Sequence, residues 1–150
     1  MAPRPERLTP EAFAPFGQVI TPAGARSWPI NAGSCVRFHD LAALDPGPDG
    51  RVILSLFRAQ PRPEPLVLVE MERHPLGSQA FLPVGPVRWL VVVAPTDDPR
   101  ATRIFEPGPG EGVLYAPNTW HHPLVVLGAP ADFWVLDREG PGENCEVVPL

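Results

Sequence analysis

Lysine is absent from this sequence, and all 12 basic residues are arginines. A chain without lysine cannot form a lysine Schiff base with a carbonyl substrate, and it cannot supply the lysine of a phosphate-binding P-loop. Two large classes of enzyme are thereby excluded. The arginines form no cluster and the net charge is −5, so the electrostatic pattern of a nucleic-acid-binding protein is missing. We therefore expect the partner to be a small molecule or another protein.

Cysteines and long apolar runs are also scarce. The only two cysteines, Cys35 and Cys145, do not make a disulfide framework, and we expect both to be free thiols in the core. No apolar run approaches the roughly 20 residues that a membrane-spanning helix needs. The sequence opens without the pattern of a signal peptide. These features predict a cytoplasmic protein that binds no membrane.

Proline and glycine, in contrast, are abundant, with 23 and 13 residues, and 44% of the chain is hydrophobic. The apolar residues come in short runs with proline and glycine between them, which is typical of many short strands joined by tight turns. A chain of 150 residues has the length of one domain. We therefore predict a single domain that spans residues 1–150.

One short helix is expected near the N-terminus, within residues 7–17. Thr9 is suited to the N-cap, Pro10 to the first helical position, and Gly17 to the stop, while Leu8 and Phe13 suit a hydrophobic staple. The remaining pattern predicts strands at 18–21, 34–39, 51–60, 66–74, 78–84, 87–95, 102–107, 112–117, 122–128 and 132–138. This arrangement predicts an all-β fold, an antiparallel barrel or two-sheet jelly roll, with residues 139–150 as a tail over it.

The residues that favour chemistry gather in two places. In the strand predicted at 66–74, side chains alternate, so that Glu72 and His74 face the same way. A turn at 75–77 then brings Ser78 and Gln79 close to them. A second cluster contains Tyr115, Trp120 and two adjacent histidines, His121 and His122. Adjacent residues on a strand face opposite sides, so at most one of these histidines lines a pocket, and the sequence leaves open which one.

These side chains are compatible with a divalent ion. The imidazoles of His74 and His121 and the carboxylate of Glu72 suit Ni, Fe, Mn or Zn and leave coordination positions open. Gln79 is a fourth candidate ligand, although an amide is a poor ligand and can bind a substrate instead. The alternative is that Glu72 and His74 only pair with each other and have a structural role. Arg37 and Arg58 offer a cationic group for a small carboxylate, or else lie in surface ion pairs.

The stretch "ERHPLGSQAF" (72–81) followed by "WHHPL" (120–124) resembles the two motifs of the cupin superfamily. In this resemblance, Glu72 and His74 take the H-x-H places, Gln79 takes the place of the glutamate, and His121 takes the last histidine. Together with "INAGSCVRFHDL" (30–41), "DFWVLDR" (132–138) and "GENCE" (142–146), these stretches resemble the ureidoglycolate lyase family, also called ureidoglycolate hydrolase. The similarity runs from "LTPEAFAPFGQVI" (8–20) nearly to the C-terminus.

The resemblance implies a cupin-type barrel, usually a homodimer, that releases urea from ureidoglycolate and leaves glyoxylate in allantoin and purine breakdown. A nickel requirement is associated with some members. It implies that Glu72, His74 and His121 are catalytic or metal-binding residues and that a group of residues binds substrate: Arg37, Arg58, Ser78, Gln79, Phe81, Tyr115 and Trp120. One departure concerns the substrate, because Ala116 and Pro117 stand where the family usually has His-Arg after the tyrosine.

Two other functions fit the same residues. One is a different metal-dependent cupin enzyme that oxygenates or isomerises a small hydroxy or keto acid. The other is a jelly-roll module without catalysis that binds a small acid or serves as a dimerisation domain. Iron with oxygen consumption would indicate the first, and tight binding of a carboxylate without turnover would indicate the second.

Overall fold

The computed structural model describes residues 3–150, and these form fourteen strands, one short α-helix and one 3-10 turn. The prediction of an all-β protein with one short N-terminal helix is therefore confirmed. None of the helices in this part of the chain is long and apolar enough to span a membrane.

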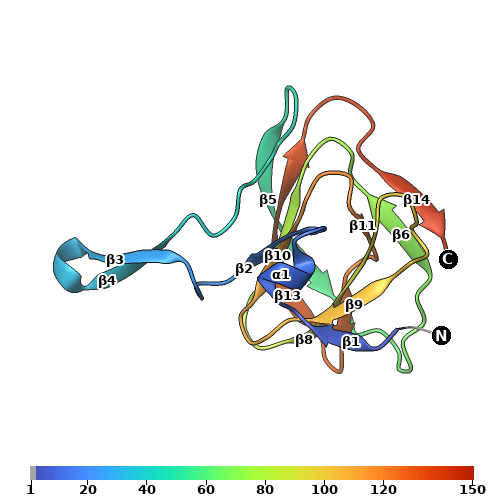
Figure 1. Ribbon diagram of the computed structural model, residues 1–150, viewed down its shortest axis with the longest axis horizontal. Helices are drawn as coiled ribbons and strands as arrows, with labels where there is room; N and C mark the ends of the chain where they lie inside the picture. The colour runs from blue at the N-terminus through green and yellow to red at the C-terminus, as the bar shows by residue number, and fades with distance from the viewer. Residues whose placement is uncertain (1–2) are drawn as a thin grey trace.

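Most strands belong to two sheets (Figure 1). The larger sheet has the order β1-β9-β8-β11-β6-β14, and β12 also pairs with β8. Its strands are β1 (Pro5–Arg7), β9 (Arg103–Glu106), β8 (Arg88–Ala94), β11 (Trp120–His121), β6 (Glu70–Arg73), β14 (Glu146–Pro149) and β12 (Val125–Leu127). The smaller sheet has the order β2-β10-β7-β13-β5 and contains β2 (Gly17–Ile20), β10 (Gly112–Tyr115), β7 (Gln79–Pro83), β13 (Ala131–Glu139) and β5 (Arg51–Ala59).

The two sheets keep free edges, so the described strands do not form a closed barrel. Strand β5 pairs with β13 on one side only, through nine successive residues, and β2 ends the same sheet at its other edge. Strands β1 and β9 run parallel, whereas the other pairs within the two sheets are antiparallel.

A third, two-stranded sheet stands apart from this body. It consists of β3 (Arg26–Ile30) and β4 (Cys35–His39), joined by the 3-10 turn η1 (Asn31–Gly33). In Figure 1 this hairpin projects sideways from the two sheets on two connecting segments. We call residues 22–44 the arm.

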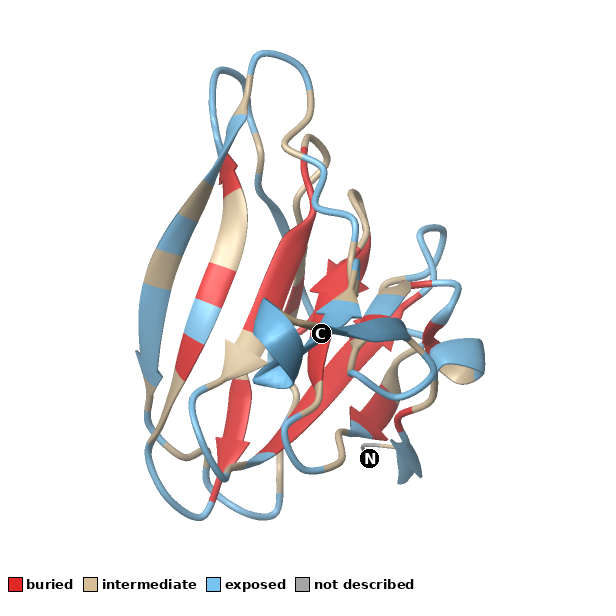
Figure 2. Cartoon of the chain, turned by 90° about the vertical axis from the view of Figure 1, so that its left-hand side faces the viewer, coloured by how far each residue is buried: buried red, intermediate tan, exposed pale blue. Residues whose placement is uncertain are grey.

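The main core lies between the two sheets and explains why they face each other. It joins buried side chains from both sheets and from the helix: Phe13, Val19, Phe81, Trp89, Val91, Val93, Phe105, Val113, Tyr115, Val126, Phe133 and Val135. A second cluster lies on the outer side of the larger sheet and contains Met71, Leu90, Val92, Ala94, Ile104, Trp120, Val125 and Leu127. Figure 2 shows the buried residues concentrated in the strands of the two sheets. Every second residue of β8 therefore serves one core, and the residues between serve the other.

The predicted helix forms as α1 (Pro10–Phe13), and Thr9 caps it by accepting a hydrogen bond from Ala12 N at 3.2 Å. Leu8 and Phe13 are both buried, as the staple requires.

Replacing Thr9 with Ala is expected to lower the free energy of unfolding by about 1 kcal/mol, because the N–H of Ala12 loses its acceptor. Thr9→Ser keeps a hydroxyl group and should retain most of the wild-type stability. Urea unfolding of the two variants measures the difference, and equal stability of Thr9→Ala and wild type would contradict it.

The structure differs from the predicted strand pattern in three places. Residues 66–69 do not join β6, and the N–H of Val69 is donated to the side chain of His122 in place of a neighbouring strand. The expected tail contains strand β14, which pairs with β6 from Glu146 to Pro149. The strand at 34–39 has a partner, β3, that the pattern did not predict because Pro29 interrupts it.

Candidate active site

The centre of the site is a group of three side chains, Glu72, His74 and His121, that come from distant parts of the chain. His121 on β11 lies directly opposite Glu72 on β6, and His74 follows β6 immediately. One ligand atom from each of the three residues lies within 4.8 Å of the others. The ring centres of His74 and His121 are 5.1 Å apart. Two hairpins therefore converge on one point, which the sequence motifs predicted.

Main-chain oxygens set the orientation of both imidazoles. His74 Nδ1 lies 2.8 Å from the carbonyl oxygen of Asn144, and His121 Nδ1 lies 2.9 Å from that of Thr119. A carbonyl oxygen only accepts, so each Nδ1 must carry the proton and donate it. Each Nε2 then has a free lone pair, and both Nε2 atoms are buried without a hydrogen-bond partner among the described residues. Histidines held in this way are typical metal ligands.

The carboxylate of Glu72 faces these nitrogens. Its Oε1 lies 3.4 Å from His121 Nε2, too far for a well-directed hydrogen bond, and the two atoms attract only when Nε2 carries a proton or a cation lies between them. The interaction with His121 is the main cause that holds the pKa of Glu72 below its ordinary value, against the opposing effect of burial. His74 and His122 shift this pKa in the same direction. Glu72 is therefore an anion at neutral pH and can act as a ligand or a base.

The smaller sheet supplies the facing wall. Gln79 on β7 pairs with Tyr115 on β10, so their side chains project from the same face. Gln79 Nε2 donates to Asp137 Oδ2 at 3.1 Å, and this fixes the amide, because a carboxylate only accepts. Gln79 Oε1 is left buried without a partner. This wall therefore offers one free hydrogen-bond acceptor, Gln79 Oε1, close to the carboxylate of Asp137.

Tyr115 connects the wall to the histidines. Its ring stacks on the ring of His121, with centres 4.2 Å apart and planes 9° apart. Burial is the main cause that raises the pKa of Tyr115, and the charge of Glu72 adds to it, so the phenol stays neutral. The ring of Phe81 packs edge-on against the ring of Tyr115, with the ring centres 5.8 Å apart. Stacking and packing together limit the motion of His121.

Arg138 holds the loops around the site. Its side chain is buried, and it donates to the carbonyl oxygens of Pro46 and Pro141. These contacts join the 45–50 loop to the segment whose Asn144 orients His74. Gly47 has φ +67°, and a Cβ there would collide with the carbonyl oxygen of Leu76, so this loop also presses on the turn after β6.

Comparison with known proteins agrees with this geometry. A sequence model described as ureidoglycolate lyase matches residues 2–150. The chain belongs to the ureidoglycolate lyase family. The ureidoglycolate lyase of Burkholderia cepacia is 54% identical over 151 residues, which cover 98% of this chain and 85% of that protein. The ureidoglycolate lyase of Rhodobacter capsulatus is 52% identical over 147 residues, 97% of this chain and 91% of that protein. Ureidoglycolate lyase 2 of Rhizobium meliloti is 49% identical over 150 residues, with 97% and 92% covered.

Two residues that the family resemblance implied as substrate contacts lie elsewhere. Trp120 precedes His121 and faces the opposite side of β11, where its indole belongs to the outer core and donates to Thr96 O at 3.2 Å. Ser78 is buried and bonded to the main chain of Asp45, accepting from its N–H at 2.7 Å. Strand alternation is the reason in both cases, since each is the direct neighbour of an inward-facing residue. Ser78 therefore anchors the 45–50 loop, and Trp120 packs the outer core.

The two arginines expected to bind a carboxylate are also not brought to the three-residue group within one chain. Arg58 is exposed near the far end of β5 and forms an ion pair with Asp132 at 3.0 Å. Arg37 lies on strand β4 of the arm, where its Nε contacts His39 Nδ1 at 3.2 Å.

The structure answers the question of which histidine faces inward. His121 does, whereas His122 turns to the other side, and its Nε2 accepts from Val69 N at 3.2 Å. Burial lowers the pKa of His122, so the ring stays neutral. Cys145 follows Asn144 and, like Cys35, is exposed. The expectation that both thiols lie in the core was wrong, because Cys35 lies on the arm and Cys145 lies at the surface near the site.

Asn144 and Asp137 are the supporting residues that the motifs did not identify as part of the site. Asn144 binds twice, through its carbonyl oxygen to His74 and through Oδ1 to the N–H of Leu76 at 2.8 Å. The signal for Asn144 was weak, because it stands in a Gly-rich segment that has the composition of a loop. Asp137 is a charged residue within an apolar strand, which was a usable signal.

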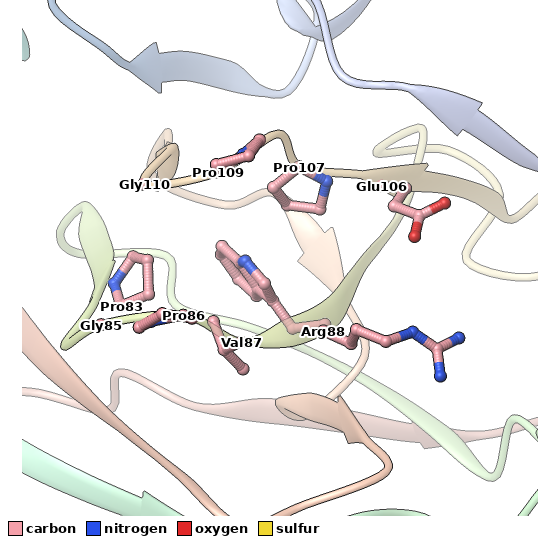
Figure 3. A pocket seen from close by; sticks show the side chains of 10 residues that line it. Pro83, Gly85, Pro86, Val87, Arg88, Glu106, Pro107, Pro109 and Gly110 are labelled. Atoms are coloured by element: carbon pink, nitrogen blue, oxygen red, sulfur yellow. The ribbon is translucent and has the colours of Figure 1, made fainter.

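A separate pocket of about 380 Å³ lies between the turn after β7 and the turn after β9. Figure 3 shows prolines around it, with Arg88 and Glu106 at one side. Its lining residues are Pro83, Gly85, Pro86, Val87, Arg88, Trp89, Glu106, Pro107, Pro109 and Gly110. Neither Glu72 nor the two histidines line it, so it is not part of the candidate active site.

Proposed function

We propose that this chain is a ureidoglycolate lyase, which releases urea from ureidoglycolate and leaves glyoxylate in allantoin and purine breakdown. The observation that carries the proposal is the convergence of Glu72 with two histidines whose free Nε2 atoms face it, in a chain that belongs to the ureidoglycolate lyase family. We also propose that the two facing sheets are a cupin-type jelly roll, in which this position is the usual place of the site.

A divalent cation fits the three residues. Two buried Nε2 lone pairs without partners and one carboxylate are a complete set of three protein ligands, which leaves positions for a substrate. We propose that Glu72, His74 and His121 hold the ion and, by family resemblance, that it is nickel. Such an ion, when bound, lowers the pKa of a hydroxyl group and offsets the charge of a carboxylate.

The reaction needs two proton transfers. In ureidoglycolate, one carbon carries a hydroxyl group, a carboxylate and the ureido nitrogen. Removal of the hydroxyl proton lets the C–O bond become C=O while the C–N bond breaks, and the departing nitrogen takes up a proton as urea leaves. Glu72 is ionised and close to both imidazoles, so it is placed to accept the hydroxyl proton. A positioned acid or base of this kind contributes about 10² to 10⁴ in rate.

The facing wall is suited to the ureido group, which carries N–H donors and a carbonyl acceptor. Gln79 Oε1 is a free acceptor for one of those N–H groups, and Asp137 holds the amide in the orientation that presents it. An unmet buried acceptor favours a ligand that donates, since a buried polar atom without a partner costs about 1–3 kcal/mol. We therefore assign Gln79 to the substrate and not to the metal.

Metal binding and urea release can be tested together. Protein dialysed against a chelator is expected to bind one Ni²⁺ per chain in a calorimetric titration, and to release urea from ureidoglycolate only after the ion is restored. The affinity should fall as the pH is lowered, because each ligating imidazole must lose a proton before it binds. His74→Ala should weaken the titration, whereas His39→Ala on the arm should not.

Two results would contradict this. A titration that is the same for His74→Ala and wild type would remove the metal assignment. Unchanged urea release after complete removal of metal would show that the side chains act alone. Iron in the protein as isolated, with oxygen consumption on a hydroxy or keto acid, would replace the proposed reaction with an oxygenase reaction.

A further inference from the structure

The arm has two different faces, and the two main sheets cover neither of them. In the register of β3 and β4, Val36 and Phe38 project to one side, with Pro29 and Ser27 opposite them. Val36 and Phe38 are 52% and 47% exposed. The other side carries Arg26, Trp28, Arg37 and His39. Figure 1 shows the arm held away from the body, so an apolar surface of its own remains open to a partner.

The smaller sheet offers a matching surface. Trp134 on β13 lies opposite Leu56 on β5, and both point outward, because the residues flanking Trp134 belong to the main core. Several outward apolar side chains of these two strands are exposed: Val52, Leu54, Leu56 and Trp134. Strand β5 is also an edge strand of nine residues with one side unpaired among the described strands. A long apolar edge of this kind favours pairing with another chain.

Charge also favours a second copy as the partner. The arm contains two arginines and one carboxylate, Asp40, although the chain as a whole has a net charge of −5. An arm with this small excess of positive charge is attracted to the acidic body of another copy. In a dimer with twofold symmetry, each chain would bind the arm of the other, so every contact would occur twice and both arms would be covered.

We propose that the arm of one chain pairs with the free edge of β5 in a second copy. This pairing puts Val36 and Phe38 beside the outward apolar residues of β5, and it puts Arg37 on the inner side, at the mouth of that copy's active site. The site lies at the beginning of β5, because Ile53 pairs with Asp137, which binds Gln79. An arm lying along β5 therefore passes this mouth.

Besides the proposed metal ion, the substrate carboxylate needs a cationic side chain, and the arginines of the chain's own body beside the site are already engaged. Arg73 pairs with Glu146 at 2.7 Å, Arg51 pairs with Glu139 at 2.8 Å, and Arg138 is bonded to carbonyl oxygens. The turn at 116–119 contains no basic residue. Arg37 has no carboxylate partner in the described part of the chain, and its guanidinium lies 5.8 Å from the ring centre of Trp28. This role of Arg37 rests on the proposed function, since the group it would bind is the carboxylate of ureidoglycolate.

The first test does not depend on activity. Cys35 lies on the same strand face as Arg37 and about 7 Å away, while Cys145 adjoins the site residue Asn144. A short bis-maleimide should therefore link Cys35 of one chain to the partner's Cys145 and give a covalent dimer on a denaturing gel. Cys35→Ser and Cys145→Ser should each remove this product. A covalent dimer that survives Cys145→Ser, or none in wild type, would overturn the proposal.

The second test is the oligomeric state. Wild type should be a dimer by light scattering, and the double variant Val36→Ser with Phe38→Ser should dissociate at least about 10-fold more readily, because two apolar contacts per arm are lost. Val84→Ser is the matched control, since Val84 is 48% exposed and lies outside both surfaces. A monomeric wild type, or a double variant that dimerises like the control, would contradict docking of the arm.

The third test asks whether Arg37 acts between chains. Arg37→Ala and Glu72→Gln should each release little urea alone. After the two are mixed and allowed to exchange subunits, about one quarter of wild-type activity should return, because half of the dimers are mixed and one site in each is intact. No recovery, despite confirmed mixed dimers and an active wild type, would show that Arg37 does not serve the partner's site. If wild type itself releases no urea, the proposed function fails, and the cross-link still decides where the arm docks.

Discussion

Glu72→Gln is expected to lower the rate of urea release by about 10² to 10⁴ while the protein stays folded. The substitution keeps the size of the side chain but removes the charge that faces two imidazole nitrogens. A neutral amide can neither accept the hydroxyl proton nor contribute a carboxylate ligand. Steady-state assays of urea release, with circular dichroism as the check on folding, measure the change.

The control for this variant is Glu6→Gln. It removes the same charge from an exposed ion pair with Arg103, and β1, which carries Glu6, is separated from β6 by three strands, so the rate should stay unchanged. Glu72→Gln with wild-type turnover would remove Glu72 from the mechanism. A rate loss of similar size in Glu6→Gln would mean that net charge, and not the position of the carboxylate, is responsible.

Arg138→Met is expected to lower the free energy of unfolding by about 3 kcal/mol, because the buried guanidinium and its hydrogen bonds to the carbonyl oxygens of Pro46 and Pro141 are lost. The guanidinium is packed against Gly50, Gly77 and Gly140, and each of these positions leaves no room for a Cβ beside it. Methionine fills part of the space but donates nothing. Urea unfolding should show the loss in stability.

The same variant should also weaken Ni²⁺ binding, since Arg138 joins the 45–50 loop to the segment that orients His74. Arg51→Met is the matched control, because Arg51 is exposed and its loss should cost well under 1 kcal/mol. If Arg138→Met and Arg51→Met are equally stable, Arg138 does not hold the loops together.

Short-range patterns predicted much of this molecule. The helix with its Thr9 cap follows from side chains within a few residues of one another, and strand alternation placed Glu72 and His74 on one face. The spacing of the two histidine motifs resembled those of a known family, which made the meeting of the hairpins predictable. The family membership and the all-β class followed from these signals.

What could not be predicted depends on contacts between distant segments. The bounds of β6 depend on its pairing with β14, more than 70 residues later. Asn144 stands in a segment with the composition of a loop, and only the folded chain shows its carbonyl oxygen beside His74. The sequence also could not show that His121 faces inward and His122 outward. The two residues are adjacent and have the same local sequence, and only the folded sheet fixes their directions.

The carbonyl oxygen of Asn144 has a consequence for the order of biosynthesis. During translation, the imidazole of His74 emerges 70 residues before the residue that orients it. The group of Glu72, His74 and His121 therefore reaches its final geometry only after the C-terminal segment has left the ribosome and β14 can pair with β6.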